Sequence, residues 1–303
     1  MATTTQLIPH VTLGTQGFQV SKLGFGCMGL SGAYNDPLPE QDGISVIHYA
    51  FTQGITFFDT ADLYGVDGSN EILVGKALKQ LPREKIQLAT KFGISRGDAP
   101  GFTGVSIKGS PEYVRSCCEA SLKRLGVGYI DLYYQHRVDT SVPIEDTVGE
   151  LKKLVEEGKV KELGIGIVPY SPLGRGFFGG KGVLENVSAV SNLTSYPRFQ
   201  AENLEKNKSI YDRIESLGNK HGCTPAQLAL AWVLHQGQDV VPIPGTTKIK
   251  NLDQNLGALS LKLSEEDVKE ISAAVPVDDV AGSRYYNGSD QLSWKFANTP
   301  PKV

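Results

Sequence analysis

The sequence predicts a single-domain α/β barrel, and three observations in its 303 residues lead to that fold class. Short apolar runs alternate with longer stretches of helical period from Leu23 to Ala258. Such alternation requires crossover connections, because parallel strands cannot be joined by tight hairpins. Polar side chains at Asp59, Lys91 and His136 each follow a different predicted strand, and barrel enzymes build their sites from several strand ends. An open, doubly wound sheet fits the alternation equally well, so the position of the polar residues decides for the barrel.

Six short apolar runs are predicted to form the strands of the parallel sheet. Each has the length that is typical of a strand rather than a helix. They are Leu23–Gly26, Ile55–Phe58, Ile86–Thr90, Tyr129–Gln135, Ile165–Val168 and Val240–Ile243. Ahead of them, Val11–Val20 predicts two short strands around a Gly-containing turn, a hairpin that we expect to plug one end of the barrel.

Helices are predicted between and after these strands from apolar spacing and capping residues. Ser110 is a good N-cap, and Pro111 suits the first helical position. Asn70 is the predicted N-cap of the helix before it. The predicted helices cover Gly43–Phe51, Glu71–Leu78, Ser110–Leu125, Ile144–Glu157, Asn203–His221, Pro225–Gln236 and a last, capped helix from Ser264 to Ala274.

Two segments are predicted to be loops. Phe177–Ala201 is rich in Gly, Ser and Asn and shows no period, so we expect a mobile loop. Tyr285–Val303 is polar and aromatic and contains proline, and we expect it to cover the active face. No tandem repeat and no linker-like change of composition divides the chain, so residues 1–303 are predicted to form one domain.

The composition excludes several classes of protein. With 40% apolar and 21% charged residues, the chain is an ordinary globular one. Thirty basic against 33 acidic side chains give a net charge of −3, which argues against a nucleic-acid partner. No run reaches the roughly 18 apolar residues of a membrane span, and the N-terminus has no signal-like region, so we expect a cytoplasmic protein. The four cysteines form no CxxC motif, and we expect reduced thiols and no metal site.

Gly24–Gly29 matches the GxGxxG pattern of dinucleotide-binding loops, but its context disagrees with that function. In such loops the glycines open a helix whose N-terminus receives the pyrophosphate. Here Gly32, Pro37 and Pro39 intervene before any helix begins. We therefore predict no Rossmann turn at this position.

Four side chains of complementary chemistry follow the predicted strands: Asp59, Tyr64, Lys91 and His136. Each alone has a structural explanation, as a cap, a packed ring or a buried histidine. Together, an acid, a phenol, an amine and an imidazole at the ends of hydrophobic strands form a set that can protonate a carbonyl oxygen.

At these residues the sequence resembles the aldo-keto reductase superfamily and, within it, the plant branch of auxin-induced-type and perakine-reductase-like enzymes. The resemblance extends from Leu13–Gly17 through Ile243–Lys248 to Trp294–Asn298. It implies a TIM-type (β/α)8 barrel that uses NADPH to reduce aldehydes and ketones. It also implies that the four residues just named are the catalytic tetrad.

Carbonyl reduction by hydride transfer requires these residue types. Negative charge builds on the carbonyl oxygen and must be neutralised by a positioned acid, here Tyr64. An unperturbed phenol has a pKa of about 10. We therefore expect the Lys91 ammonium to lower the pKa of Tyr64, and Asp59 to hold Lys91 as an ion pair. His136 is expected to hydrogen-bond the substrate oxygen and orient it.

The resemblance also implies a binding site for NADPH. Val168–Gly176 resembles the strand-seven segment of the family, in which a tyrosine ring stacks on the nicotinamide and the next residues line the pyrophosphate. Gly245–Asn255 resembles the site for the adenosine end, where a glycine, a helix N-terminus and a lysine attract the 2′-phosphate and favour NADPH over NADH. Each segment also has a structural alternative. Val168–Gly176 can be a strand that ends in a Pro-Gly turn, and the lysines of Gly245–Asn255 can be solvated side chains at the start of a helix. The implied cofactor-binding residues are Met28, Tyr170, Ser171, Leu173, Arg175, Gly245, Thr247, Lys248 and Asn255.

The chain departs from the family at one place. After the helix that ends at Gly158, the family continues with a fifth strand, a helix, a sixth strand and another helix, whereas here Lys161–Glu162 runs directly into Leu163–Ser171. About two strand-helix units are thus predicted to be absent at this junction, which leaves an incomplete barrel of about six units. No residues match the Ser/Asn pair and the Gln that bind the nicotinamide carboxamide in the family. Such a barrel must change its shear, stay open or borrow strands from another copy.

The leading functional hypothesis is an NADPH-dependent reductase of a small aldehyde or ketone, with activity impaired by the deletion. The alternatives are a non-catalytic NADPH-binding or interaction protein derived from this family, and a phosphate-handling barrel enzyme that uses no nicotinamide. Substrate choice is expected to depend on the loops around Ala33–Glu40, Gly93–Lys108 and the C-terminal segment, with Tyr34 and Trp294 as candidate aromatic walls. The sequence leaves the oligomeric state open.

Overall fold

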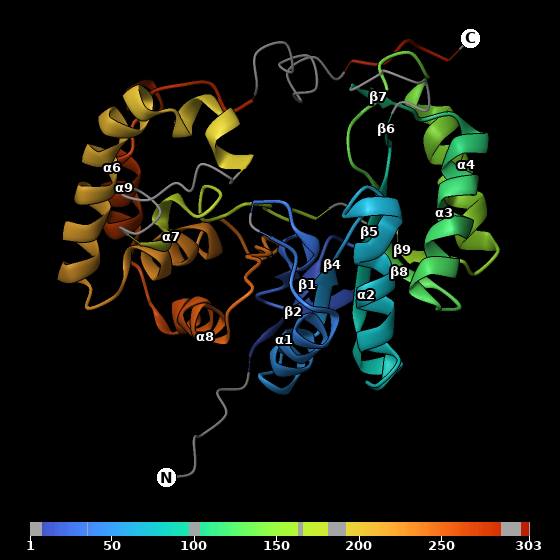
Figure 1. The fold of residues 1–303 in the computed structure, drawn as a ribbon, viewed down its shortest axis with the longest axis horizontal. Coiled ribbons are helices and arrows are strands. Elements are labelled where there is room, and N and C mark those ends of the chain that lie inside the picture. Colours follow the sequence, from blue (N-terminus) through green and yellow to red (C-terminus); the bar gives the residue numbers. More distant parts are fainter. Residues whose placement is uncertain are drawn as a thin grey trace.

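The computed structural model describes residues 8–34, 36–96, 104–162, 166–180, 192–285 and 298–302. The chain forms two halves that lie beside each other (Figure 1). One half holds a parallel sheet with four helices, and the other holds the helices of the C-terminal part of the chain. Within the described ranges, no helix is long and apolar enough to cross a membrane.

A five-stranded parallel sheet forms the first half, in the order β3-β4-β5-β8-β9. Its strands are β3 (Phe25–Gly26), β4 (Phe57–Asp59), β5 (Gln87–Phe92), β8 (Ile130–Gln135) and β9 (Val160–Glu162). Beyond β3 the described residues form no further strand of this sheet, but backbone hydrogen bonds continue it. The Gly24 amide donates to the Pro242 carbonyl at 3.0 Å. Ile167 forms an isolated parallel bridge with Val240, and the Val241 amide donates to the Ile167 carbonyl at 2.9 Å. The predicted α/β class with a parallel sheet is confirmed, but the barrel is not closed.

Two details of the predicted strand set are wrong. Val160–Glu162 forms β9, which the sequence does not reveal as a strand. Gly158 has φ of +71° and ends the preceding helix. The chain then continues in the extended conformation that pairs with β8. The predicted strand Val240–Ile243 is reduced to the bridge at Val240, because Pro242 has no amide to donate to a ladder. Part of the predicted strand Ile165–Val168 lies outside the described residues.

Four helices accompany the sheet and pack against one another in chain order. They are α1 (Glu40–Thr52), α2 (Ser69–Leu78), α3 (Pro111–Leu125) and α4 (Ile144–Glu156). Helix α3 begins as predicted, with Pro111 in its first turn and the Ser110 hydroxyl accepting the Tyr113 amide. The predicted cap of α2 is wrong, because Gly68 is the N-cap residue and Asn70 lies inside the helix.

The second half is built from α6 (Ala201–Lys220), α7 (Pro225–Leu234), α8 (Ile249–Gly257) and α9 (Glu265–Ala274). Ser264 caps α9 as predicted and forms a capping box with Asp267. The described part of the segment expected to be one mobile loop contains three short 3₁₀ helices, Phe177–Gly179, Asn192–Ser195 and Pro197–Phe199. Residues 181–191 of that segment, and most of the predicted C-terminal cover including Trp294, lie outside the described residues.

The predicted N-terminal hairpin is confirmed as β1 (His10–Leu13) paired antiparallel with β2 (Phe18–Ser21). Its Leu13 and Val20 pack in one cluster with Phe57, Ala89 and Leu132 of the sheet. The hairpin therefore covers the inner face of the sheet below the strand ends. A second hairpin, β6 (Ile94–Arg96) with β7 (Val105–Ile107), follows β5.

The GxGxxG motif does not open an α-helix. Strand β3 leads into a 3₁₀ helix at Met28–Ser31, and the first α-helix begins only at Glu40. This geometry agrees with the prediction that the motif is no Rossmann turn.

Candidate active site

The predicted tetrad lies at the C-terminal ends of the strands, on the inner face of the sheet. Successive side chains of a strand point to opposite faces. Phe57, Ala89 and Leu132 belong to the inner core, so residues two positions later point the same way. Those residues are Asp59 on β4, Lys91 on β5 and Tyr134 on β8, and His136 comes two positions after Tyr134.

Lys91 connects the residues of this group. Its Nζ lies 2.5 Å from Asp59 Oδ1 and donates to the Thr60 carbonyl at 2.7 Å and to the Tyr64 hydroxyl at 3.2 Å. The ion pair is buried, with the side chains of Lys91 and Asp59 only 5% and 2% exposed. Burial lowers the pKa of Lys91, but Asp59 and the nearby phenols outweigh it, so that pKa stands well above its usual value. Lys91 is therefore a permanent cation beside the phenol of Tyr64.

Tyr64 holds its proton more tightly than expected from the sequence. Burial raises the pKa of the phenol, and the Lys91 ammonium lowers it only in part, so that the pKa stands above its usual value. The expectation of an unusually acidic phenol is wrong for this structure, because desolvation outweighs the neighbouring charge. A general acid must carry its proton before it can give it, so Tyr64 is in the form that donation requires.

His136 lies beside Tyr64 as a neutral imidazole. The two rings meet edge to face, with centroids 5.7 Å apart and planes at 83°. Burial lowers the pKa of His136 well below its usual value, and the charges of Lys91 and Arg137 lower it further. Its Nδ1 is buried and has no hydrogen-bond partner among the described residues. A neutral ring of this kind can hydrogen-bond a substrate oxygen placed next to the phenol.

Tyr134 belongs to the same network, although the sequence analysis does not identify it. Its hydroxyl donates to Asp59 Oδ2, and its ring centroid lies 5.2 Å from Lys91 Nζ. Burial raises the pKa of Tyr134 well above its usual value, so the hydroxyl remains a donor. The alternation of side chains along β8 could have identified it, because Tyr134 lies two residues before His136 on the same face.

Tyr134→Phe is expected to lower the free energy of unfolding by about 2 kcal/mol, because it removes a hydrogen bond to a buried carboxylate. Tyr133→Phe is the matched control. The neighbouring Tyr133 is buried even more fully, but its hydroxyl has no partner in the described part of the chain, so we expect no loss of stability. Urea unfolding measures both variants, and equal losses would contradict a specific role for Tyr134.

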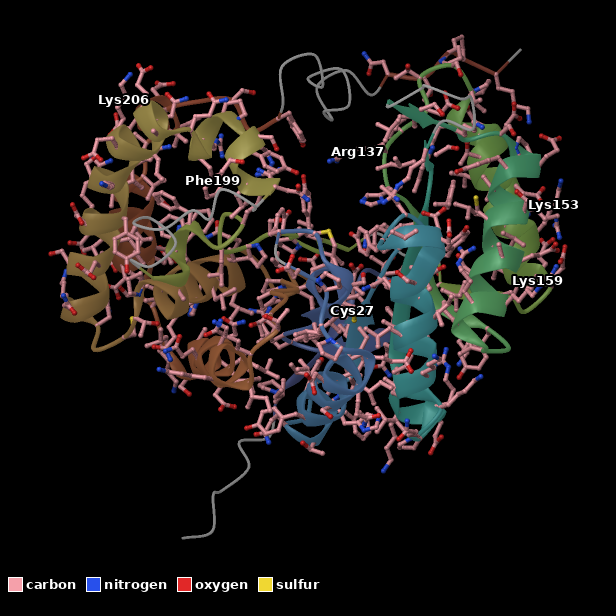
Figure 2. The ribbon with its side chains drawn as sticks, in the orientation of Figure 1. Cys27, Arg137, Lys153, Lys159, Phe199 and Lys206 are labelled. Atoms are coloured by element: carbon pink, nitrogen blue, oxygen red, sulfur yellow. The ribbon has the colours of Figure 1, made fainter. Side chains whose placement is uncertain are left out.

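The loop that carries Tyr64 is fixed by Asn70. Its Nδ2 donates to the Cys27 carbonyl and to Ser31 Oγ, both at 2.8 Å, and its Oδ1 accepts from Thr60 Oγ1 at 2.6 Å. Cys27 follows the first strand of the sheet (Figure 2). These bonds explain why Asn70 does not cap α2, and they hold the Thr60 carbonyl where it accepts from Lys91.

Tyr170, Ser171, Leu173 and Arg175 lie on a tight turn after the bridge residue Ile167. Ser171 and Arg175 have φ of +50° and +58°, a region that residues other than glycine rarely occupy. Such backbone strain is often found at ligand-binding segments. Tyr170 is 41% exposed, whereas Leu173 packs against a core cluster of α7 and so has a structural role.

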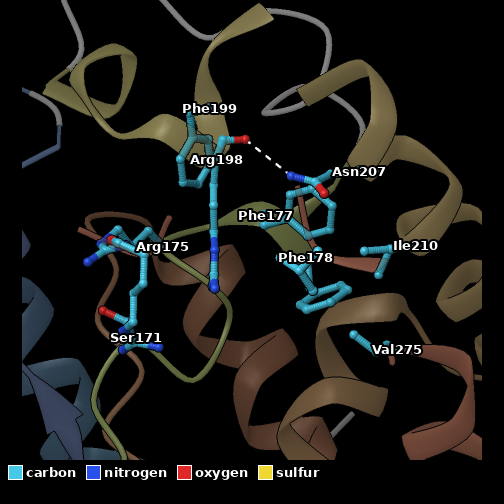
Figure 3. Close-up of a pocket in the computed structure, with 12 residues that line it drawn as sticks. Ser171, Arg175, Phe177, Phe178, Arg198, Phe199, Asn207, Ile210 and Val275 are labelled. Atoms are coloured by element: carbon cyan, nitrogen blue, oxygen red, sulfur yellow. Dashed lines mark hydrogen bonds between the residues drawn. The ribbon is translucent and has the colours of Figure 1, made fainter. Parts of the chain in front are cut away.

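A cavity of about 130 Å³ opens beside this turn (Figure 3). Of the predicted cofactor residues it contains Ser171 and Arg175, and it contains none of the tetrad. Its lining includes three arginines and three phenylalanines: Arg175, Arg198, Arg284, Phe177, Phe178 and Phe199.

The three arginines give the cavity an excess of positive charge. Among described residues, none of them has a carboxylate within 4.0 Å, and Arg175 Nε is buried without a hydrogen-bond partner. Burial, with the charges of Arg284 and Arg175, lowers the pKa of Arg198. Such a cluster favours an anionic ligand. Sequence spacing could not reveal it, because Arg198 and Arg284 come from segments far from Arg175 along the chain.

The predicted 2′-phosphate segment lies at the start of α8. Lys248 is exposed at the N-cap position, and its amide donates to Thr246 Oγ1 at 3.1 Å. Glycine is needed at position 245 for a structural reason, because a Cβ there would lie 2.4 Å from the Gly26 carbonyl oxygen. The close approach of the backbones at Gly26 and Gly245 thus requires glycine at this position whatever binds nearby.

The structure brings some of the predicted site residues together and leaves others apart. The tetrad forms one hydrogen-bonded and ring-packed cluster. Ser171 and Arg175 share the cavity. Of the remaining predicted residues, Met28 begins the 3₁₀ helix after β3, Thr247 precedes α8, and Asn255 is 3% exposed on α8.

Comparisons with known proteins identify the family. The model of the aldo/keto reductase family matches residues 22–166 and 161–276. A probable aldo-keto reductase 1 from Glycine max is 68% identical over 339 aligned positions, which cover 97% of each chain. The glycerol dehydrogenase structure from Gluconobacter oxydans has a TM-score of 0.75 at 26% identity, covering 88% of this chain and 94% of that one. A thermostable aldo-keto reductase in complex with the inhibitor epalrestat has a TM-score of 0.67 at 23% identity, covering 88% of this chain and 99% of that one. At this identity the likeness concerns the fold alone. This chain belongs to the aldo/keto reductase family.

Proposed function

We propose that this chain belongs to the plant branch of the family and that it reduces an aldehyde or ketone to the alcohol with NADPH. The observation that carries the proposal is the buried Lys91–Asp59 ion pair, whose ammonium lies 3.2 Å from the Tyr64 hydroxyl. It provides a proton donor and a fixed cation at one point, which is what carbonyl reduction needs. No specific observation favours the alternative of a non-catalytic NADPH-binding protein.

Each residue of the network has a separate task in the proposed mechanism. Tyr64 gives its proton to the carbonyl oxygen, and Lys91 stabilises the phenolate that remains. Asp59 and Tyr134 hold the Lys91 ammonium in place, so no rearrangement is needed when charge develops. Neutral His136 hydrogen-bonds the carbonyl oxygen and aims it at the phenol. A bound nicotinamide cofactor supplies the hydride.

The charge of the cavity fits a dinucleotide cofactor. A diphosphate is an anion, and Arg175 and Arg198 lack carboxylate partners in the described residues, so they would hold it. Family members generally use NAD(P)H, and the exposed Lys248 at the start of α8 is our reason for preferring NADPH. Tyr170 would stack on the nicotinamide. We propose further contacts from Met28, Ser171, Leu173, Gly245, Thr247 and Asn255.

We also infer that a segment of the family barrel is absent after β9. Glu162 ends β9 at one edge of the sheet, and Ile167 lies beyond the opposite edge. The family model matches residues 161–166 twice, and the alignment with the soybean relative spans more positions than this chain has residues. The absent strands belong where the sheet stays open. Because the family binds the nicotinamide carboxamide there, we expect weaker positioning of the cofactor and reduced turnover.

Inserting the additional residues of the soybean relative after Glu162 is expected to raise turnover at least tenfold, because a misplaced cofactor costs rate steeply. The measurement is NADPH oxidation with a panel of aldehydes and ketones, with NADPH binding followed by fluorescence. Equal rates in both chains would contradict the inferred gap. NADPH binding without turnover in both would favour the non-catalytic alternative, and no NADPH binding would refute the proposed cofactor.

A further inference from the structure

A cluster of two arginines and two tyrosines lies outside the proposed proton network. Arg137 Nη2 donates to the Tyr170 hydroxyl at 3.4 Å, and the hydroxyls of Tyr170 and Tyr285 are 3.4 Å apart. The Arg137 guanidinium lies 5.6 Å from the Tyr285 ring centroid, and that of Arg284 lies 5.1 Å from the Tyr170 ring centroid. We call these four residues the Arg-Tyr cluster.

The Arg-Tyr cluster has donors but no carboxylate. Neither Arg137 nor Arg284 has an acidic side chain within 4.0 Å in the parts of the chain that the structure describes. Elsewhere the arginines Arg115, Arg124 and Arg213 each bind a glutamate or an aspartate. The chain as a whole is acidic, so this positive charge is a local feature and not a consequence of composition.

The cluster lies next to the proposed reaction centre. Arg137 follows His136 directly in the chain, and its charge is one cause of the lowered pKa of that histidine. Arg137 lies between the two halves of the molecule (Figure 2). Its contacts with Tyr170 are on the exposed side of the site, where a ligand has access. An anion bound to Arg137 would therefore lie near His136.

The surroundings of Tyr170 stabilise negative charge. Burial raises the pKa of the Tyr170 phenol, but hydrogen bonds from Arg137 and Tyr285 and the charge of Arg284 outweigh it and bring that pKa to about 7. A carboxylate accepts hydrogen bonds only, and it matches the planar fork of the Arg137 and Arg284 guanidinium groups as well as the hydroxyl of Tyr285. The cluster therefore has the chemistry of an oxyanion-binding subsite.

We propose that Arg137, supported by Tyr285 and Arg284, binds an anionic oxygen group of the substrate. The preferred substrates are then aldehydes or ketones that also carry a carboxylate or a phosphate ester. This inference rests on the proposed carbonyl reduction and names its substrate class. Arg137 would thus determine which substrates are preferred, and it would take no part in proton transfer.

Arg137→Gln tests the inference with 4-oxobutanoate against its methyl ester, and with glyceraldehyde 3-phosphate against glyceraldehyde. We expect kcat/KM for the anionic member of at least one pair to fall about ten- to a hundredfold, mainly through KM, and the neutral members to change less than about twofold. Which pair responds distinguishes a carboxylate from a phosphate ester. Arg213→Gln is the charge-matched control, because Arg213 pairs with Asp279 in the helical half. Equal changes for anionic and neutral members, or no change, would overturn the inference.

A second measurement separates this inference from the proposed reaction. Binding of butanoate and of glycerol 3-phosphate to the NADP⁺-loaded chain is followed by NMR, which needs no turnover. If the chain turns over no carbonyl compound, loss of anion binding in Arg137→Gln but not in Arg213→Gln still supports the subsite. Binding that Arg137→Gln leaves unchanged would overturn the subsite even in an active enzyme.

Discussion

Lys91→Met is expected to lower the free energy of unfolding by about 3–5 kcal/mol. Methionine keeps much of the volume, but it leaves the Asp59 carboxylate buried, with only the Tyr134 hydroxyl as a side-chain donor in the described residues. A buried carboxylate without its counter-charge is strongly destabilising. Urea unfolding followed by tryptophan fluorescence measures the change.

The double variant Asp59→Asn with Lys91→Met is the matched control for the buried charge. Asparagine keeps the shape of aspartate and removes its charge, so we expect most of the lost stability to return. Lys76→Met controls for the loss of a lysine as such, because Lys76 and Glu40 form an exposed pair that should contribute less than about 1 kcal/mol. A double variant no more stable than Lys91→Met would show that the unpaired charge is not the cause.

Tyr64→Phe is expected to reduce kcat/KM for carbonyl reduction by about 10²–10⁴, the usual contribution of a positioned general acid, and so in effect to abolish reduction. The ring is kept, and only the hydroxyl that Lys91 contacts is lost, so NADPH should still bind. The measurement combines NADPH oxidation with fluorescence titration of the cofactor.

Tyr49→Phe is the control for removing a tyrosine hydroxyl. Its hydroxyl donates to Asp253 at 2.8 Å on the surface, away from the tetrad, and we expect activity to be unchanged. Parent-like turnover in Tyr64→Phe would refute the assigned proton donor. Loss of NADPH binding in that variant would assign the hydroxyl to cofactor binding instead.

The parts of the fold that the sequence predicts well are those set by local chemistry. Ser110 and Pro111 determine the start of α3 because the cap and the fixed φ act within one turn. The first hairpin follows from two short strands around a glycine turn. The tetrad is predictable for a related reason, since its members follow strong apolar strands whose carboxyl ends meet at one edge of a parallel sheet.

The missed features depend on partners that are distant in the sequence. Strand β9 is too short for a period, and it exists because β8 offers it a backbone ladder. Arg198 and Arg284 reach the cavity only through the packing of the helical half. The pKa of Tyr64 depends on a balance of burial and charge, and burial cannot be judged from spacing. Of these missed features, only Tyr134 could be predicted from the sequence, because side chains alternate along a strand and Tyr134 lies two residues before His136.

Isotopic labelling can follow the hydrogens of the proposed reaction themselves. Reduction is run with NADPH that carries deuterium on one face or the other of nicotinamide C4, using this chain, its Tyr64→Phe variant and the chain with the inserted segment. We expect one deuterium on the carbinol carbon, from one labelled face only, and hardly any alcohol from Tyr64→Phe. Alcohol without the label, or labelled alcohol formed at the parent rate by Tyr64→Phe, would contradict hydride transfer coupled to proton donation by Tyr64.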